Sequence, residues 1–312
     1  TGRRVSALTA VGVREMTAGK LFGLAALVFA AVTFVVIGDT AGKLLTSGGV
    51  DPLIVAWSRF VLAALFLLPF SGLSRNEFVG FTDWRVLIRA GFITCGISCI
   101  LTALRTEPIA NVFGAFFIGP VVSYVLAILF LGEQPSRSRG LLLAFGFVGV
   151  MLVVKPGFGT SLGMLFALAA GGCYGAYLTM TRAVAGSYRP GFLLISQLLV
   201  GSILLTPLGV SAEVPSFDMQ VIGLILLSAF GSALGNYLLV VSNQRAEARL
   251  ISPLVYSQLI SASVVGFLVF GDWPDAYTLL GLLMIALSGV GSLIMYQRSQ
   301  KNAGSGAKLD RV

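Results

Sequence analysis

Residues 21–45 read LFGLAALVFAAVTFVVIGDTAGKLL, a run in which only Asp39 and Lys43 are charged. A helix that crosses a bilayer needs about 20 mostly apolar residues, so this stretch predicts a transmembrane helix. The whole chain agrees, because 56% of its 312 residues are hydrophobic and only 11% are charged. Soluble domains carry charges at roughly 25% of positions. This composition excludes a soluble enzyme, a nucleic-acid-binding module and a disordered protein, and it leaves a polytopic membrane protein.

Further stretches with the length and composition of a spanning helix follow along the chain. We therefore predict an all-α integral membrane protein with ten transmembrane helices. The expected helices are Leu21–Leu45, Pro52–Phe70, Trp84–Leu104, Ile109–Leu131, Gly140–Val154, Gly163–Ala183, Phe192–Leu208, Val221–Val241, Leu250–Phe270 and Tyr277–Tyr296. The connections are short and rich in Gly, Pro, Ser and charge, so none can form a separate domain. Residues 1–20 are too weakly apolar for a signal peptide, and we expect them and residues 298–312 to be cytoplasmic tails.

The positive charges predict the orientation of these helices. If the N-terminus is inside, only Lys43, Arg105 and Lys155 of the 21 Lys and Arg residues fall outside, and Arg59 falls within a span. All the others fall on the cytoplasmic side, where positive residues are retained. We therefore expect a multi-pass protein of the cell inner membrane with both termini in the cytoplasm.

The two halves of the chain resemble each other. Pro52, Arg59 and Pro69 correspond to Pro190, Gln197 and Pro207 at one constant offset, and Gly132–Pro135 corresponds to Gly271–Pro274 at an offset larger by a single position. Each half, residues 21–157 and 158–297, has five expected spans. Because five is an odd number of spans, the two halves have opposite orientations in the membrane, which predicts an inverted repeat around a central cavity. Such repeats are a recurring transporter architecture with the substrate site near the midplane.

Two stretches carry a family resemblance. The first is Ala103–Ala110, with Pro120 and Leu131–Glu133. The second is Ala246–Pro253, with Tyr256, Gln258, Phe270–Asp275, Gly281 and Ser288-Gly289. These residues resemble the drug/metabolite transporter superfamily, specifically its ten-span EamA branch. The resemblance implies that spans 1, 3, 4, 6, 8 and 9 enclose a central cavity, with spans 5 and 10 packed outside.

The function expected from this resemblance is export of small metabolites, most of all amino acids with broad selectivity, by alternating access. The alternative is an uptake carrier for a nucleoside-like or sulfonium metabolite. The expected partners are the lipid bilayer and a small-molecule substrate, with no nucleic acid, and the expected assembly is a monomer or a weak homodimer.

Arg59 is the basic residue deepest within an expected span, and a charge there is a functional candidate. Asp39 lies at a similar depth and could pair with Arg59 or, along its own helix, with Lys43. Two interpretations stay open: a structural ion pair, or contact of Arg59 with a substrate carboxylate. Glu107, Glu133 and Asp272 lie at span ends, where we expect helix capping or dipole pairing.

Polar and aromatic residues near the midplane are further candidates for the binding surface. Each could instead serve interhelical packing. They are Phe113, Phe116, Phe117, Tyr124, Cys173, Tyr174, Tyr177, Asn236, Tyr237, Tyr256 and Gln258. Three GxxxG pairs predict close helix packing and could also act as flexing points: Gly38/Gly42, Gly171/Gly175 and Gly231/Gly235.

Other classes of membrane protein find little support. The chain has no histidine and three cysteines without CxxC spacing, so we expect no metal site and no cofactor. It has no phosphate-binding loop for ATP, and no paired midplane carboxylates or HExxH for a membrane enzyme. The repeat argues against a multi-subunit channel. Asp39 is the only acidic residue within an expected span, so we predict a facilitator rather than a proton-coupled carrier.

Overall fold

The computed structural model of the chain describes residues 18–135, 137–155, 161–184, 186–211, 218–245 and 254–309. Throughout these ranges the regular structure is helical. The helices are α1 (Ala18–Ser47), α2 (Pro52–Leu67), η1 (Leu68–Phe70), η2 (Arg75–Thr82), α3 (Trp84–Leu104), α4 (Ile109–Phe116), α5 (Gly119–Leu131), α6 (Arg137–Val154), α7 (Leu162–Val184), α8 (Pro190–Ser211), α9 (Met219–Arg245), α11 (Gln258–Phe270) and α12 (Ala276–Leu309). The predicted all-α membrane fold is confirmed.

Seven helical segments in the described ranges are long and apolar enough to cross a membrane. Three shorter apolar segments, Gly140–Val154, Gln258–Phe270 and Ala276–Gly291, coincide with the remaining expected spans. The total of ten spans therefore stays a prediction. The last helix runs to Leu309, beyond the expected end at Tyr296, so the predicted tail at 298–312 is largely helical.

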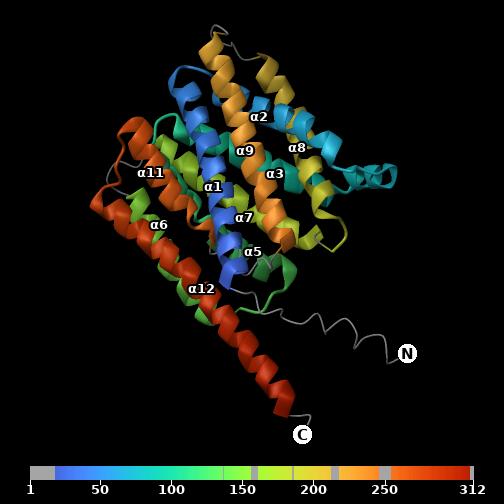
Figure 1. The fold of residues 1–312 in the computed structure, drawn as a ribbon, viewed down its shortest axis with the longest axis vertical. Helices are drawn as coiled ribbons and strands as arrows, with labels where there is room; N and C mark the ends of the chain where they lie inside the picture. Colours follow the sequence, from blue (N-terminus) through green and yellow to red (C-terminus); the bar gives the residue numbers. More distant parts are fainter. Residues whose placement is uncertain are drawn as a thin grey trace.

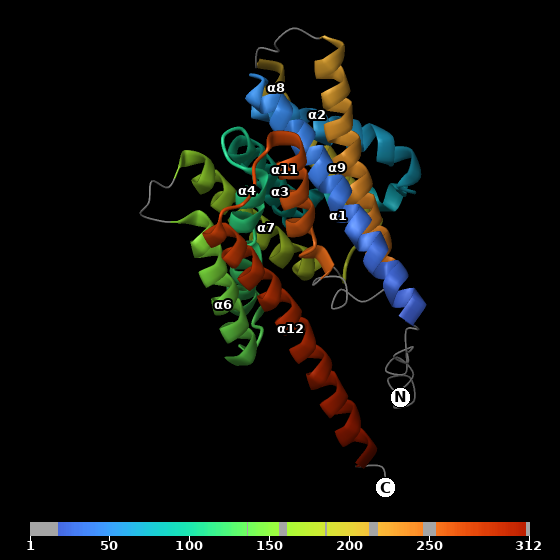
Figure 2. The same cartoon turned by 60° about the vertical axis from the view of Figure 1, so that its left-hand side comes forward.

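The helices pack in pairs that are distant in the sequence. Figure 1 shows α1 beside α9, and α3 packs against α7 in the interior. The helices α6 and α12 lie side by side on one flank (Figure 2), as the resemblance implied for spans five and ten. The first turn of α1 and the last turn of α12 lie toward the same end of the molecule in both views.

The expected helix Ile109–Leu131 is not continuous, which corrects the prediction. The chain leaves α4 after Phe116, makes a turn at Phe117 and Ile118, and starts α5 at Gly119. Pro120 explains the break, because proline has no N–H for the helix ladder and its ring clashes with the carbonyl four residues earlier. That carbonyl belongs to Phe116, the last residue of α4.

A second interruption lies at the equivalent place in the second half of the chain. Tyr256 and Ser257 form a turn just before α11, so the expected helix Leu250–Phe270 is also interrupted. Its first residues, 250–253, lie outside the described ranges. The C-terminal ends of α5 and α11 also correspond to each other. Gly132 and Gly271 follow these helices in the left-handed conformation, with φ of 66° and 73°. Glycine adopts this conformation without steric cost.

The acidic residues after these glycines, for which we expected helix capping or dipole pairing, form ion pairs. Glu133 lies 3.6 Å from Arg182 and Asp272 lies 3.3 Å from Lys43. Lys43 also donates to the Glu107 carbonyl at 2.9 Å, and it lies 4.4 Å from the centre of the Phe270 ring. Lys43 therefore connects α1 to the segment before α4 and to the end of α11.

An ion pair outside the spans fixes the short helix η2. Arg189, just before α8, donates to both oxygens of Glu77 at 2.5 and 2.8 Å. These hydrogen bonds lower the pKa of Glu77 to about 2. Because the folded pKa lies below the unfolded value, the stabilisation is present above pH 5 and is lost as the pH falls toward 2. The attachment of η2 is therefore intact at neutral pH.

The glycine pairs bring helix backbones into contact. A Cβ atom on Gly38 would lie 2.7 Å from the backbone nitrogen of Ser232, and one on Gly231 would lie 2.9 Å from the Cα of Gly38. A Cβ on Gly171 would lie 2.5 Å from the Phe116 carbonyl oxygen, and one on Gly175 would lie 2.6 Å from that of Gly119. The helix break at Phe117 therefore rests directly on the glycine face of α7.

We expect Gly171→Ala to destabilise the protein by about 1–3 kcal/mol, because the new methyl group would overlap the backbone of Phe116. Gly172→Ala is the matched control, since it adds the same methyl group one residue along α7, with nothing within 4 Å of the new Cβ. Thermal unfolding of the purified protein in detergent measures both. Equal melting temperatures for the two variants would contradict this account of the α4–α7 contact.

Candidate functional site

Asp39 and Arg59 form a buried ion pair between α1 and α2. The Arg59 Nη1 lies 2.5 Å from the Asp39 Oδ1, and the side chains of Arg59 and Asp39 are 5% and 6% exposed, respectively. The Arg59 Nε donates to the Ser228 hydroxyl at 2.7 Å and Nη2 donates to the Gly38 carbonyl at 2.6 Å. Since each guanidinium nitrogen has an acceptor and Lys43 binds elsewhere, this geometry favours the structural interpretation over direct contact with substrate.

Arg89 is a second buried guanidinium, in α3, where the sequence analysis expected a cytoplasmic charge. It is 3% exposed. Its Nε donates to the Thr181 hydroxyl at 2.8 Å, and its Nη1 donates to the Leu193 carbonyl at 2.9 Å. Its Nη2 donates at 2.9 Å to both the Tyr177 hydroxyl and the Gln197 Oε1.

The two guanidinium clusters occupy equivalent positions in the halves of the chain. Tyr177 follows Asp39 at the same offset at which Gln197 follows Arg59. Ser228, which binds Arg59, follows Arg89 at an offset larger by a single position. The cluster around Arg59 thus combines Asp, Arg and Ser, whereas that around Arg89 combines Tyr, Gln and Arg. Among the described residues, only the first cluster holds a carboxylate.

A row of aromatic rings connects the helix breaks to Arg89. We call these five rings, Tyr256, Phe117, Phe116, Tyr174 and Tyr177, the aromatic row. The rings of Tyr256 and Phe117 stack at 4.8 Å, and Phe117 meets Phe116 edge-on at 6.3 Å. Phe116 lies 4.8 Å from Tyr174, which stacks on Tyr177 at 5.8 Å. The guanidinium carbon of Arg89 lies 4.6 Å from the Tyr177 ring.

All five members of the aromatic row are among the predicted candidate residues, and all of them except Phe117 are half-buried. The other predicted residues have different surroundings. Phe113 is buried behind Phe116, and Gln258 is buried at the start of α11. Asn236 donates to the Ser232 carbonyl of its own helix, Tyr237 is 46% exposed on α9, and Tyr124 is half-buried on α5.

Arg89 was not predicted as a site residue, because its place near the start of a span suggested an interfacial charge. The offsets between corresponding residues of the two halves could have indicated Arg89. The offset that relates Arg59 to Gln197 also relates Asp39 to Tyr177 and, within one position, Arg89 to Ser228. Both clusters could therefore have been found by comparing the halves position by position.

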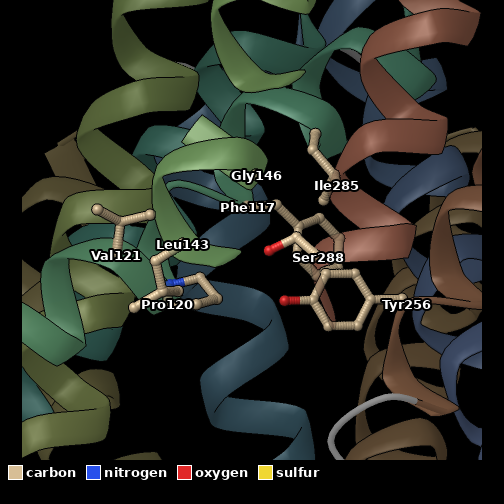
Figure 3. Close-up of a pocket in the computed structure, with 8 residues that line it drawn as sticks. All are labelled: Phe117, Pro120, Val121, Leu143, Gly146, Tyr256, Ile285 and Ser288. Carbon is tan, nitrogen blue, oxygen red and sulfur yellow. The ribbon is translucent and has the colours of Figure 1, made fainter. Parts of the chain in front are cut away.

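Two cavities lie near the two ends of α4. One, of about 10 Å³, lies beside the stacked pair Phe117 and Tyr256, and the hydroxyl groups of Tyr256 and Ser288 point toward it (Figure 3). The other, of about 150 Å³, lies between Pro108–Asn111 and Asp272–Asp275. Small-molecule sites have volumes of roughly 300–1,000 Å³, so a metabolite can enter either place only if helices move apart.

Comparison with known proteins identifies the family. The model of the EamA-like transporter family matches residues 17–155 and again residues 161–294. The chain belongs to the EamA-like transporter family. This membership makes it a multi-pass membrane protein that transports small metabolites. The family match occurs once in each half of the chain, and the repeat of residues 21–157 and 158–297 stays a prediction.

Several relatives of this EamA-like chain have named substrates. A riboflavin transporter of Rhizobium johnstonii is 28% identical over 74% of this chain and 77% of its own length. A riboflavin transporter of Vibrio cholerae is 24% identical over 83% and 88%. An S-adenosylmethionine uptake transporter of Rickettsia bellii is 24% identical over 74% and 80%. None of these names describes amino-acid export, so that expectation has no support from them.

The fold of this EamA-like chain also has a counterpart among solved structures. A crystal structure matches it with a TM-score of 0.62 and 16% sequence identity, and the match covers 89% of this chain and 98% of the other. At this identity the likeness shows the shared fold alone.

Proposed function

We propose that this carrier takes up a nucleoside-like metabolite, meaning a planar heterocycle joined to a polar chain, by alternating access. The observation that supports this substrate class is the aromatic row. Aromatic side chains bind planar heterocycles by stacking, which contributes roughly 1–3 kcal/mol per base in nucleic-acid-binding proteins. The aromatic row passes through the helix breaks, and four of its five rings are half-buried and offer such faces.

The names of the relatives support the same class and direction. Riboflavin and S-adenosylmethionine both contain a planar nitrogen heterocycle joined to a hydroxyl-bearing chain or sugar. The Rickettsia relative is named as an uptake transporter. Uptake of such a compound was the alternative in the sequence analysis, and it replaces amino-acid export as the function proposed here.

The two helix breaks support alternating access. Discontinuous helices near the midplane are a recurring feature of transporters with inverted repeats, where one half rocks against the other. Here the breaks at Phe117 and Tyr256 come from corresponding positions and their rings stack on each other. We propose that the stacked pair marks the axis between the halves, with both termini in the cytoplasm and the protein in the inner membrane.

Counterflow in proteoliposomes tests the function. We expect labelled riboflavin or S-adenosylmethionine to exchange across the membrane, with saturation, while labelled amino acids do not. Tyr174→Leu should reduce exchange about tenfold because it removes one ring of the aromatic row, and Tyr174→Phe should retain it. Exchange of amino acids alone, unaffected by Tyr174→Leu, would refute the proposed substrate class.

A further inference from the structure

Arg89 differs from the other two buried cations in the described part of the chain. Arg59 contacts the Asp39 carboxylate and Lys43 contacts the Asp272 carboxylate. The described contacts of Arg89 are two hydroxyls, one carbonyl and one amide oxygen, all of them neutral. Asp83, the acidic residue nearest in sequence, lies before the first turn of α3 and binds Arg85 and Tyr188 instead.

The charge of Arg89 is permanent, because a guanidinium does not lose its proton in proteins. A buried charge is costly unless an opposite charge compensates it. The neutral acceptors around Arg89 satisfy its nitrogens as hydrogen-bond donors, but none of them balances its charge. Among the described residues, the cluster around Arg89 therefore has an unbalanced positive charge.

The equivalent cluster around Arg59 contains a carboxylate, whereas the described contacts of Arg89 include none. There, a guanidinium binds a carboxylate at position 39, and the corresponding position 177 holds a tyrosine. A purely structural arginine at position 89 would be expected to have a carboxylate in the same place. An interfacial arginine would extend its head group into water, whereas Arg89 is 3% exposed and donates to α7 and α8.

The position of Arg89 relates this charge to the substrate. Its guanidinium lies over the ring of Tyr177, at the end of the aromatic row. A planar ring stacked beside Tyr174 would have a substituent within reach of the Arg89 cluster. Guanidinium groups bind carboxylate and phosphate groups through paired N–H donors.

We propose that Arg89 binds the carboxylate or phosphate of the transported metabolite while the heterocycle stacks on the aromatic row. This inference rests on the proposed function and narrows it to heterocycles with an anionic group. Opening of the contact between α3 and α7 exposes the guanidinium, and the anion takes the place that Asp39 occupies beside Arg59.

The test compares ligands that differ in one anionic group, measured as inhibition of counterflow in proteoliposomes. The pairs are flavin mononucleotide against riboflavin, for phosphate, and S-adenosylmethionine against its decarboxylated form, for carboxylate. We expect the protein to prefer the member that carries the anionic group in at least one pair by roughly tenfold, since hydrogen bonds to charged groups contribute about that much. The pair with the larger preference identifies the anion.

Three variants assign this preference to Arg89. Arg89→Gln should abolish the preference, and Arg89→Lys should retain part of it. Gln197→Glu should also abolish the preference while the protein folds normally, because it supplies a carboxylate within reach of Nη2. A structural role for Arg89 would not give this result. Arg85→Gln is the control, since it removes an exposed charge four residues away on the same helix and should change nothing.

The outcomes separate this inference from the proposed function. Transport of the members that lack the anionic group, without a preference for those that carry it, overturns the role of Arg89 and leaves the proposed function standing. If no member is transported, the proposed function fails, and thermal unfolding with millimolar benzoate or benzamide still tests the anion site. Stabilisation by benzoate alone, lost in Gln197→Glu, supports the site, and equal effects of both compounds overturn it.

Discussion

Arg59→Gln should remove most of the folded protein from membranes. The Asp39 carboxylate would stay buried, with its guanidinium partner gone, and breaking a buried ion pair on one side costs about 3–5 kcal/mol. Such a loss is a large fraction of the roughly 5–15 kcal/mol by which folded proteins are stable. The measurement is the fraction of detergent-solubilised protein that elutes as a single species in size-exclusion chromatography.

The double variant Asp39→Asn/Arg59→Gln tests the cause of that loss. Both charges are then absent, so the yield should recover in part. The two new amide side chains should hydrogen-bond to each other much as Tyr177 and Gln197 do in the second half, at 3.0 Å. Arg85→Gln gives the control for loss of an exposed charge. A double variant no better than Arg59→Gln would show that Arg59 acts through something other than Asp39.

The fold was predictable from the sequence because membrane insertion depends on composition over long windows. The boundaries Pro52, Trp84 and Ile109 of the expected helices agree with the structure, since proline and polar residues end an apolar run sharply. The break after Phe116 was missed because a hydropathy profile does not detect it. Apolar residues continue through the turn, and only Pro120 interrupts the ladder of backbone hydrogen bonds.

The candidate site was less predictable, because it depends on which side chains meet. Asp39 and Arg59 could be paired from their similar depth. Tyr177 could be proposed as a midplane aromatic, but its link to Arg89 depends on the packing of α3 against α7. In that packing Gly96 of α3 faces Ala170 of α7, where an added Cβ would make an ordinary contact of 3.5 Å with the carbonyl oxygen. A glycine in an apolar run does not by itself identify its neighbour.

A pH gradient alone should not concentrate the substrate inside proteoliposomes. A carrier that moved one proton with each neutral substrate molecule would reach about a tenfold ratio for each pH unit, because one unit corresponds to about 1.36 kcal/mol. Such coupling needs an acidic or histidine side chain that faces the transport path and gains and loses a proton. The chain has no histidine, and Asp39 is the only acidic residue in the apolar segments of the described ranges.

Asp39 is poorly suited to that task, because its carboxylate is 6% exposed and bound to Arg59, a charge that is never lost. We therefore expect substrate uptake to stop at equal concentrations on the two sides, with and without an imposed gradient of one pH unit. The measurement is labelled substrate in proteoliposomes, with an ionophore that collapses the gradient as the control. Accumulation near tenfold, abolished by the ionophore, would show that the carrier is proton-coupled and that the Asp39–Arg59 pair opens during transport.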